Sequence, residues 1–376
     1  MKFSFSSEQE EFRSNLRRFL AERSPTKEVR RLMETDAGWE RDGWRAINTE
    51  LGLTAIRIPE AYGGHGFGFG EQCIVLEEMG RAVVCAPFFS TAVLAAGAIL
   101  NAGTEAEKQA LLPGIAAGDT IATLAWVEAN GRWDGAGTTM LATPSGDGYR
   151  LDGQKTNVID GHTADVIVVL ARTPGSRGDA GLSLFTVAGD AKGLSRRSLK
   201  AMDPTRKLAR LTFDGVQATP LGPIGGAAAA FERTMVEAAV CLSNEMVGGA
   251  ERLREDSVAY ALLRVQFGRQ IASFQSMKHK AADMLMDVEL AKSAAYYAAA
   301  ALDDGDADVA ATASLAKAGA SDTYIQTAVH AVQIHGGIGF TWDNDTHLWF
   351  KRAKSSEVLL GDAGYHRELM MRHWAA

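Results

Sequence analysis

The sequence has few of the cysteines that mark disulfide-rich and metal-binding proteins. Its 376 residues include three, Cys73, Cys85 and Cys241, and no two of them form a C-x-x-C pair. This number and spacing disfavour a zinc ribbon, a disulfide scaffold and a thioredoxin-type redox pair. We therefore expect the three thiols to be small buried side chains.

A basic surplus and a long apolar run are also missing. The 39 basic residues are outnumbered by 46 acidic ones, which disfavours a general nucleic-acid-binding protein. No uncharged apolar run reaches the ~18 residues that a spanning helix needs, and charges begin early in the N-terminal segment, before any apolar signal core. We expect a cytoplasmic protein without nucleic-acid or membrane partners.

The common signatures of phosphate binding, hydrolysis and metal binding do not occur. The sequence contains no G-x-x-x-x-G-K-[ST], no G-x-S-x-G and no H-E-x-x-H. The glycine-rich run from Gly63 to Gly70 lacks the G-x-G-x-x-G spacing and follows no predicted strand. His330 and His335 are five positions apart, so on a helix they point to different faces, and we expect no metal site.

The patterns that are present divide the chain into three predicted domains. Residues 1–120 are predicted to be helical, because apolar side chains such as Leu16 and Leu20 recur at helical spacing. Residues 121–222 consist of short β-type runs between turn signals, which favours a small antiparallel barrel or sandwich. Residues 223–376 are predicted to be helical again.

Three long helices are predicted in this last region. Their apolar patterns cover residues from about 227 to 266, 274 to 302 and 309 to 335. The order of the chain is therefore helical, β, helical, as in a multi-domain α+β protein.

Four segments of this chain occur together, in this order, in one known family. They are IPEAYGGHG at 58–66, GQK at 153–155, RVQFGRQI at 264–271 and AVQIHGGIGF at 331–340. Over essentially its whole length the sequence resembles the acyl-CoA dehydrogenase family. The resemblance implies an N-terminal helical domain, a middle small β-barrel and a C-terminal four-helix bundle.

The resemblance also implies a chemistry. Members bind FAD, oxidise an acyl-CoA thioester and form tetramers built as dimers of dimers. A carboxylate removes the α-proton, a hydride leaves the β-carbon for the flavin, and hydrogen bonds polarise the thioester carbonyl. Electrons then pass to an electron-transfer flavoprotein.

By this resemblance, seven residues would hold the adenosine and pyrophosphate of a neighbouring subunit's FAD. Arg264 would pair with the pyrophosphate, since a guanidinium suits phosphate oxygens. The other six would line the same groove or let the dinucleotide lie against backbone: Gln266, Phe267, Phe274, Gln333, Gly336 and Gly337.

The segments that would hold this chain's own flavin depart from the family pattern. Where the family has T-E-P-x-A-G-S-D, residues 127–134 place Val127 and Trp133 at the two hydroxyl positions. Where the family has W-I-T-N, residues 157–160 lack the aromatic side chain and the hydroxyl. We therefore expect this chain to bind its own flavin weakly, while its residues for binding a neighbouring subunit's FAD are intact.

The catalytic carboxylate is missing from its two usual positions. Leu360 stands at the commoner position and Ala238 at the position that a minority of the family uses. Glu245 lies two helical turns beyond Ala238, on the edge of an apolar stripe, whereas Glu237 is predicted to point away from that stripe. An apolar surrounding makes a carboxylate a stronger base, so Glu245 is the candidate, and Asp362 is a weaker one.

Three arrangements stay open at this point. The asymmetry resembles the degenerate subunit of mixed α2β2 acyl-CoA dehydrogenases, which act on bulky or branched acyl groups such as steroid side chains. An active homotetramer could instead use Glu245 as its base. A scaffold or regulatory homologue would bind no flavin.

Overall fold

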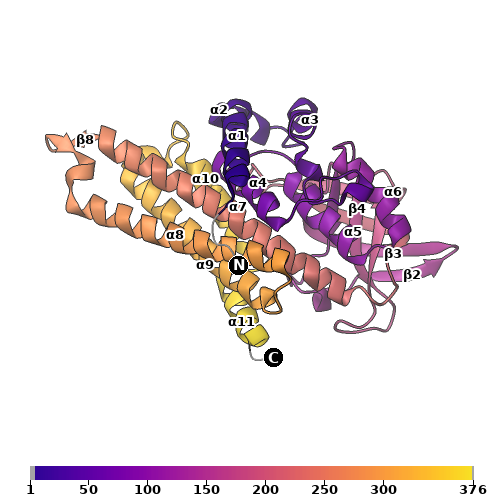
Figure 1. The fold of residues 1–376 in the computed structure, drawn as a ribbon. Coiled ribbons are helices and arrows are strands. Elements are labelled where there is room, and N and C mark those ends of the chain that lie inside the picture. Colours follow the sequence, from indigo (N-terminus) through magenta and orange to yellow (C-terminus); the bar gives the residue numbers. More distant parts are fainter. Residues whose placement is uncertain (1–4, 375–376) are drawn as a thin grey trace. The chain divides into compact units, whose positions relative to one another are not determined.

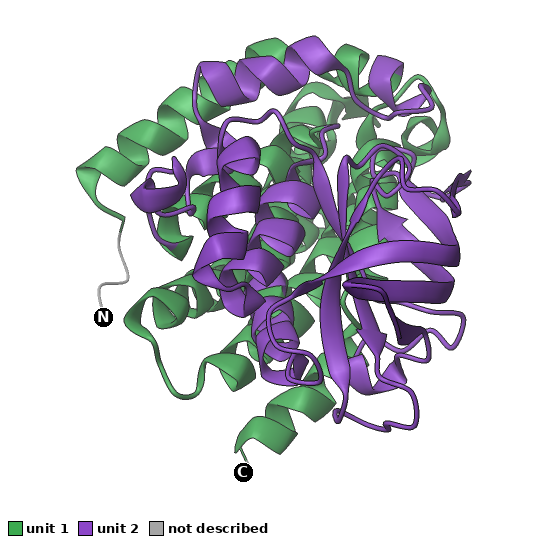
Figure 2. Cartoon of the chain, turned by 90° about the vertical axis from the view of Figure 1, so that its right-hand side faces the viewer, with its two compact units in different colours: residues 1–30, 69–84, 239–376 green, residues 31–68, 85–238 purple. Residues whose placement is uncertain are grey.

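The computed structural model describes residues 5–374, and packing groups them into two units. Unit 1 comprises residues 1–30, 69–84 and 239–376, and unit 2 comprises residues 31–68 and 85–238 (Figure 2). The predicted α+β fold class is confirmed, because helices, then strands, then helices follow one another along the chain. The three domain ranges stay a prediction.

Unit 1 is helical, and its C-terminal part is a bundle. In Figure 1, α8 and α9 run side by side and the β8–β9 hairpin projects beyond the end of α7. Helix α9 begins and ends where its sequence pattern predicts. The elements are α1 (Ser7–Arg23), α4 (Phe69–Ala82), α7 (Ala228–Leu263, from residue 239), β8 (Val265–Gln266), β9 (Arg269–Gln270), η5 (Ile271–Ser273), α8 (Gln275–Asp304), α9 (Val309–His335), η6 (Gly336–Phe340), α10 (Thr346–Val358) and α11 (Ala363–Trp374).

Short helices and one sheet make up unit 2, and α2 (Thr26–Met33) crosses from unit 1 into it. The first turns of α7 also belong to unit 2. The helices are α3 (Arg41–Thr49), η1 (Leu53–Ala55), η2 (Glu60–Tyr62), η3 (Phe89–Ala95), α5 (Ala96–Ala102), α6 (Glu105–Ala116) and η4 (Gly135–Gly137). The strands are β1 (Ala122–Ala125), β2 (Leu141–Ser145), β3 (Gly148–Ile159), β4 (Val166–Arg172), β5 (Leu182–Ala188), β6 (Leu194–Leu199) and β7 (Leu208–Leu221).

The sheet closes into a small barrel. Strands β4, β2, β3, β7 and β5 pair in that order, and β5 pairs back onto β4. Strand β1 joins the outside of this ring on β4, and β6 joins it on β7. The predicted small barrel is present, but it is not antiparallel throughout, because β4 pairs with both β1 and β2 in parallel. A parallel pairing joins strands that no hairpin connects, so local turn signals do not reveal it.

Two glycines let helices α4 and α7 touch backbone to backbone within unit 1. A Cβ added to Gly80 would lie 1.9 Å from the carbonyl oxygen of Glu245, and one added to Gly248 would lie 1.9 Å from that of Glu77. No real side chain tolerates that distance, and neither backbone can yield. The crossing therefore requires glycine at both positions.

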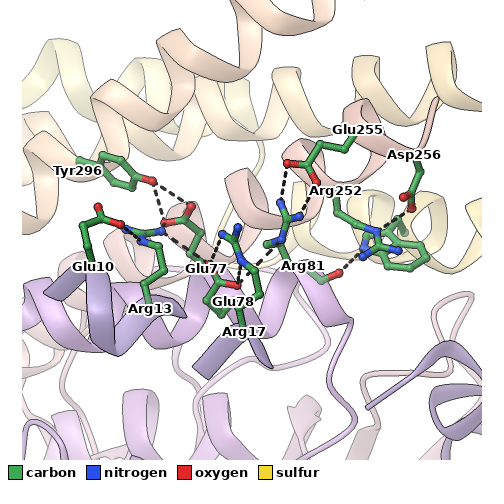
Figure 3. Close-up of polar contacts among 11 residues, drawn as sticks. Glu10, Arg13, Arg17, Glu77, Glu78, Arg81, Arg252, Glu255, Asp256 and Tyr296 are labelled. Atoms are coloured by element: carbon green, nitrogen blue, oxygen red, sulfur yellow. Dashed lines mark hydrogen bonds and ion pairs between the residues drawn. The ribbon is translucent and has the colours of Figure 1, made fainter. Parts of the chain in front are cut away.

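Charged side chains surround this crossing (Figure 3). Arg13 of α1 pairs with Glu77, and Arg17 donates two hydrogen bonds, of 2.9 and 2.7 Å, to Glu78. The hydroxyl of Tyr296 also donates to Glu77, at 2.8 Å. Because a buried carboxylate is costly without a partner, these contacts tie α1 and α8 to the buried face of α4.

The three cysteines are buried and free, in agreement with their predicted role as small apolar side chains. Within residues 5–374, none of the helices is both long and apolar enough to cross a membrane.

The glycine contact predicts a large difference between two Gly→Ala variants. Gly248→Ala should lower the free energy of unfolding by about 2 kcal/mol, because its Cβ meets the Glu77 carbonyl. Gly319→Ala, inside α9 with no atom within 4 Å of the added Cβ, should raise it by ~0.5–1 kcal/mol. Urea denaturation followed by circular dichroism measures both, and equal effects would contradict the close crossing.

Candidate functional site

One pocket of unit 1 is lined by every residue for which the family resemblance predicts dinucleotide binding. It has a volume of about 730 Å³, within the usual range for small-molecule sites. It is lined by the end of α7, the β8–β9 hairpin, the start of α8 and the end of α9. The seven predicted residues among its lining are Arg264, Gln266, Phe267, Phe274, Gln333, Gly336 and Gly337.

The hairpin at this pocket has a strained tip. Phe267 and Gly268 form its turn with φ values of 52° and 77°, the left-handed conformation that two-residue hairpins favour. Phe267 carries the cost of a Cβ in that region and is 92% exposed. Its ring meets Phe274 edge-on at 6.2 Å, and the Arg269 guanidinium lies 4.1 Å from the centre of the Phe274 ring. A strained, exposed aromatic residue indicates a surface that is used in binding.

The polar groups of the pocket suit a diphosphate. Arg264 is exposed and forms no ion pair within residues 5–374, so its guanidinium is available for phosphate oxygens. A Cβ added to Gly336 or Gly337 would meet no atom within 4 Å, so their backbone faces open space. These residues fit the adenosine diphosphate half of an FAD.

The pocket wall also contains an aromatic pair that was not among the predicted residues. The rings of Tyr260 and His335 stack with centroids 4.3 Å apart, and the Nδ1 atom of His335 lies 2.8 Å from the Ala331 carbonyl oxygen. The histidine is part of the H-G-G segment, but Tyr260 lies one helical turn before Arg264 and had no motif to mark it.

The segment expected to cradle a flavin, in unit 2, is occupied by its own internal contacts. Glu128 is buried and accepts hydrogen bonds from Lys155 at 2.7 Å and from the amides of Thr139 and Met140. Burial raises the pKa of Glu128, but the Lys155 charge and these hydrogen bonds outweigh it, so the pKa is lowered overall. Burial lowers the pKa of Lys155 to about 8.

The other side chains of residues 127–134 have no hydroxyl group, and several are engaged in contacts within the chain. The Trp133 ring packs 6.1 Å from Trp126, and Asp134 caps η4 by accepting from the Gly137 amide at 2.9 Å. The Val127 carbonyl accepts from the Thr156 amide. These residues do not fit a flavin in the way that the family pattern requires.

Leu360 lies in the loop between α10 and α11, whose carbonyl groups are hydrogen bonded to buried side chains. It is buried, with φ at 64°, and its carbonyl oxygen lies 3.1 Å from Nε2 of His366. The buried ammonium of Lys317 donates to the neighbouring carbonyls of Glu357 and Gly361, at 3.2 and 3.0 Å. Burial lowers the pKa of Lys317 to about 7 and that of His366 to about 4.

Both carboxylates on α7 near the alternative base position are paired with arginines. Glu245 is 4% exposed and accepts from Arg352 of α10 at 3.0 Å. Glu237 accepts from Arg233 at 2.8 Å and lies 3.4 Å from Arg57. The prediction that Glu237 points away from the buried side is wrong, since it is 3% exposed. Residues 237–250 of α7 are all buried, so this part of the helix is covered on every side and has no exposed face for Glu237 to occupy.

Asp362 is exposed and caps α11, accepting from the Tyr365 amide at 2.8 Å.

Three family models match consecutive parts of the chain. They describe the N-terminal, middle and C-terminal domains of acyl-CoA dehydrogenases and match residues 6–119, 123–216 and 225–375. In sequence the chain is 33% identical to acyl-CoA dehydrogenase IpdE2 of Mycobacterium tuberculosis, over 94% of this chain and 93% of that protein.

Solved structures share the fold over its full length. A variant of the Tcur3481-Tcur3483 steroid ACAD (acyl-CoA dehydrogenase) superposes with a TM-score of 0.88 at 31% identity, covering 98% of each chain. The ChsE4-ChsE5 complex from Mycobacterium tuberculosis gives 0.89 at 27% identity, covering 100% of this chain and 99% of that one. Butyryl-CoA dehydrogenase from Megasphaera elsdenii gives 0.91 at 26%, covering 100% of both.

The Glu245–Arg352 pair predicts that Glu245→Gln destabilises the protein. Removing one partner of a buried ion pair costs ~3–5 kcal/mol, and the double variant with Arg352→Met should recover part of this loss. Asp256→Asn, which breaks an exposed pair on the same helix, should cost less than ~1 kcal/mol. Urea denaturation measures all three, and equal losses for the two single variants would show that the buried pair contributes little to stability.

Proposed function

Because this chain belongs to the acyl-CoA dehydrogenase family, we propose that it is a subunit of an FAD-dependent acyl-CoA dehydrogenase and completes the FAD site of a homologous subunit. The proposed assembly is a heterotetramer that dehydrogenates a bulky or branched acyl-CoA, such as one with a steroid side chain. The observation that carries this proposal is the contrast between a complete dinucleotide pocket and an occupied flavin segment.

In this arrangement the chain contributes binding rather than proton transfer. Arg264 would neutralise the pyrophosphate, and the open backbone at Gly336 and Gly337 would let the dinucleotide approach closely. The bound FAD would supply the hydride acceptor, and its flavin would lie in the partner's cradle. An electron-transfer flavoprotein would then accept the electrons.

The base would come from the partner subunit. Leucine at position 360 has no group that accepts a proton, and its loop is held by Lys317 and His366. Glu245 and Glu237 each already accept hydrogen bonds from an arginine within the fold, so neither carboxylate is left without a partner. A homotetramer that uses Glu245 would first have to break the pair with Arg352.

The comparisons support the class of substrate and the mixed assembly. One structural neighbour is described as a steroid ACAD with two named components, and another as a complex of ChsE4 and ChsE5. Likeness at 27–31% identity extends over nearly the whole of each chain. Butyryl-CoA dehydrogenase is similar to nearly the same extent, so the proposed mixed assembly rests on the occupied flavin segment and on Leu360 rather than on overall likeness.

Flavin content tests the proposal directly. Purified alone, the chain should carry little flavin, because its own cradle lacks the hydroxyl groups. Co-expressed with a family member that has an intact base and cradle, it should form a complex with about one flavin for every two chains. Visible absorbance against protein concentration measures both.

One flavin per chain and turnover by the chain alone would overturn the mixed assembly in favour of the homotetramer. A chain that binds no flavin and forms no complex with such a homologue would favour the scaffold.

The pyrophosphate contact predicts that Arg264→Ala weakens FAD retention in the complex. Losing a charge-assisted hydrogen bond of about 1.5–3 kcal/mol corresponds to roughly 10- to 100-fold weaker binding. Arg372→Ala removes an arginine from the exposed side of α11, outside the pocket lining, and should leave retention unchanged. Flavin fluorescence released during dilution measures the difference, and equal retention would remove Arg264 from the site.

A further inference from the structure

We propose that Lys280 is a positioning residue of the dinucleotide pocket and acts by fixing the side-chain amide of Gln333. The inference deepens the proposed function and rests on its dinucleotide site. Lys280 belongs to α8 and does not line the pocket, whereas Gln333 belongs to α9 and does. The ammonium of Lys280 lies 3.1 Å from the amide oxygen of Gln333.

Donor chemistry decides which way this amide faces. An ammonium has three N–H donors and no acceptor, so it can hydrogen bond to the oxygen of a glutamine amide but not to its NH2 group. The Oε1 atom of Gln333 must therefore face Lys280. The NH2 group is left for the pocket, where it can donate two hydrogen bonds.

His330 holds the ammonium from the same face of α9. Its Nδ1 atom lies 3.5 Å from Nζ of Lys280, and it precedes Gln333 by three positions, so both side chains point toward α8. Burial and the Lys280 charge lower the pKa of His330, while Asp283 and Asp287 act in the opposite direction. A neutral imidazole can offer Nδ1 as an acceptor, so the ammonium is held between two acceptors on adjacent turns.

The orientation selects the kind of ligand atom that Gln333 meets. An NH2 group pointing into the pocket pairs with acceptors, such as phosphate and ribose oxygens or purine ring nitrogens, and not with a donor. Together with Arg264, it gives the pocket donors that match a nucleoside diphosphate. Lys280 would thus govern the affinity without touching the ligand.

Titration of the full-length chain with ADP, followed by calorimetry, tests this role. Lys280→Met should raise the dissociation constant about five-fold, because the amide loses its partner and turns freely. Lys280→Arg keeps a donor at that place and should restore most of the affinity. Lys278→Met removes the same charge from an exposed position two residues earlier and should change the affinity much less.

A double-mutant cycle separates positioning from charge. If Lys280 acts through the amide, Lys280→Met should have no further effect once Gln333→Ala has removed it. A five-fold loss that persists in the Gln333→Ala background, or an equal loss for Lys278→Met, would overturn the inference and indicate a general electrostatic effect.

ADP binding distinguishes a wrong role for Lys280 from a wrong dinucleotide site. ADP binding that is unaffected by Lys280→Met overturns the positioning role and leaves the dinucleotide site intact. ADP that does not bind the unsubstituted chain overturns both the site and the role assigned to Lys280.

Discussion

The close crossing of α4 and α7 is the constraint on which the rest of unit 1 depends. Gly80 and Gly248 bring the two backbones into contact, and the carboxylates of Glu77 and Glu78 are buried beside that contact. Those charges require arginines, which α1 supplies. This contact fixes the position of α7 and therefore of its last turn. Tyr260 lies in that turn and Arg264 directly follows the helix, and both line the pocket.

Charge is used differently in the core and in the pocket. The buried acids at the flavin segment and on α7 are each bound to a basic side chain, as with Glu128 and Lys155 or Glu245 and Arg352. Such pairs join separate elements of the fold, and the two carboxylates are engaged in them. Arg264 is instead exposed, with no ion pair in the part of the chain that the structure describes. Under the proposed function, Arg264 is the cation that meets the ligand, whereas these buried acids serve the fold.

Much of the fold could be predicted from the sequence, because helical periodicity is a local property. The bounds of α9 follow from its pattern. Each of the two pocket motifs is an unbroken run of residues that can be found without knowing the fold. The burial of Glu237, the parallel pairing of β1 with β4 and the contact of Lys280 with Gln333 depend on residues far apart in the chain. Spacing within one segment carries no information about such partners, so these features needed the structure.

The exposed apolar tip of the bundle has a consequence for the chain before it assembles. Leu263, Phe267 and Phe340 are 81%, 92% and 82% exposed, and apolar surface of this kind promotes association with other proteins. Under the proposed pairing, a subunit made in excess keeps this surface in water and becomes a target for aggregation and proteolysis. The supply of the two subunits would then be matched after synthesis, by removal of the unpaired one.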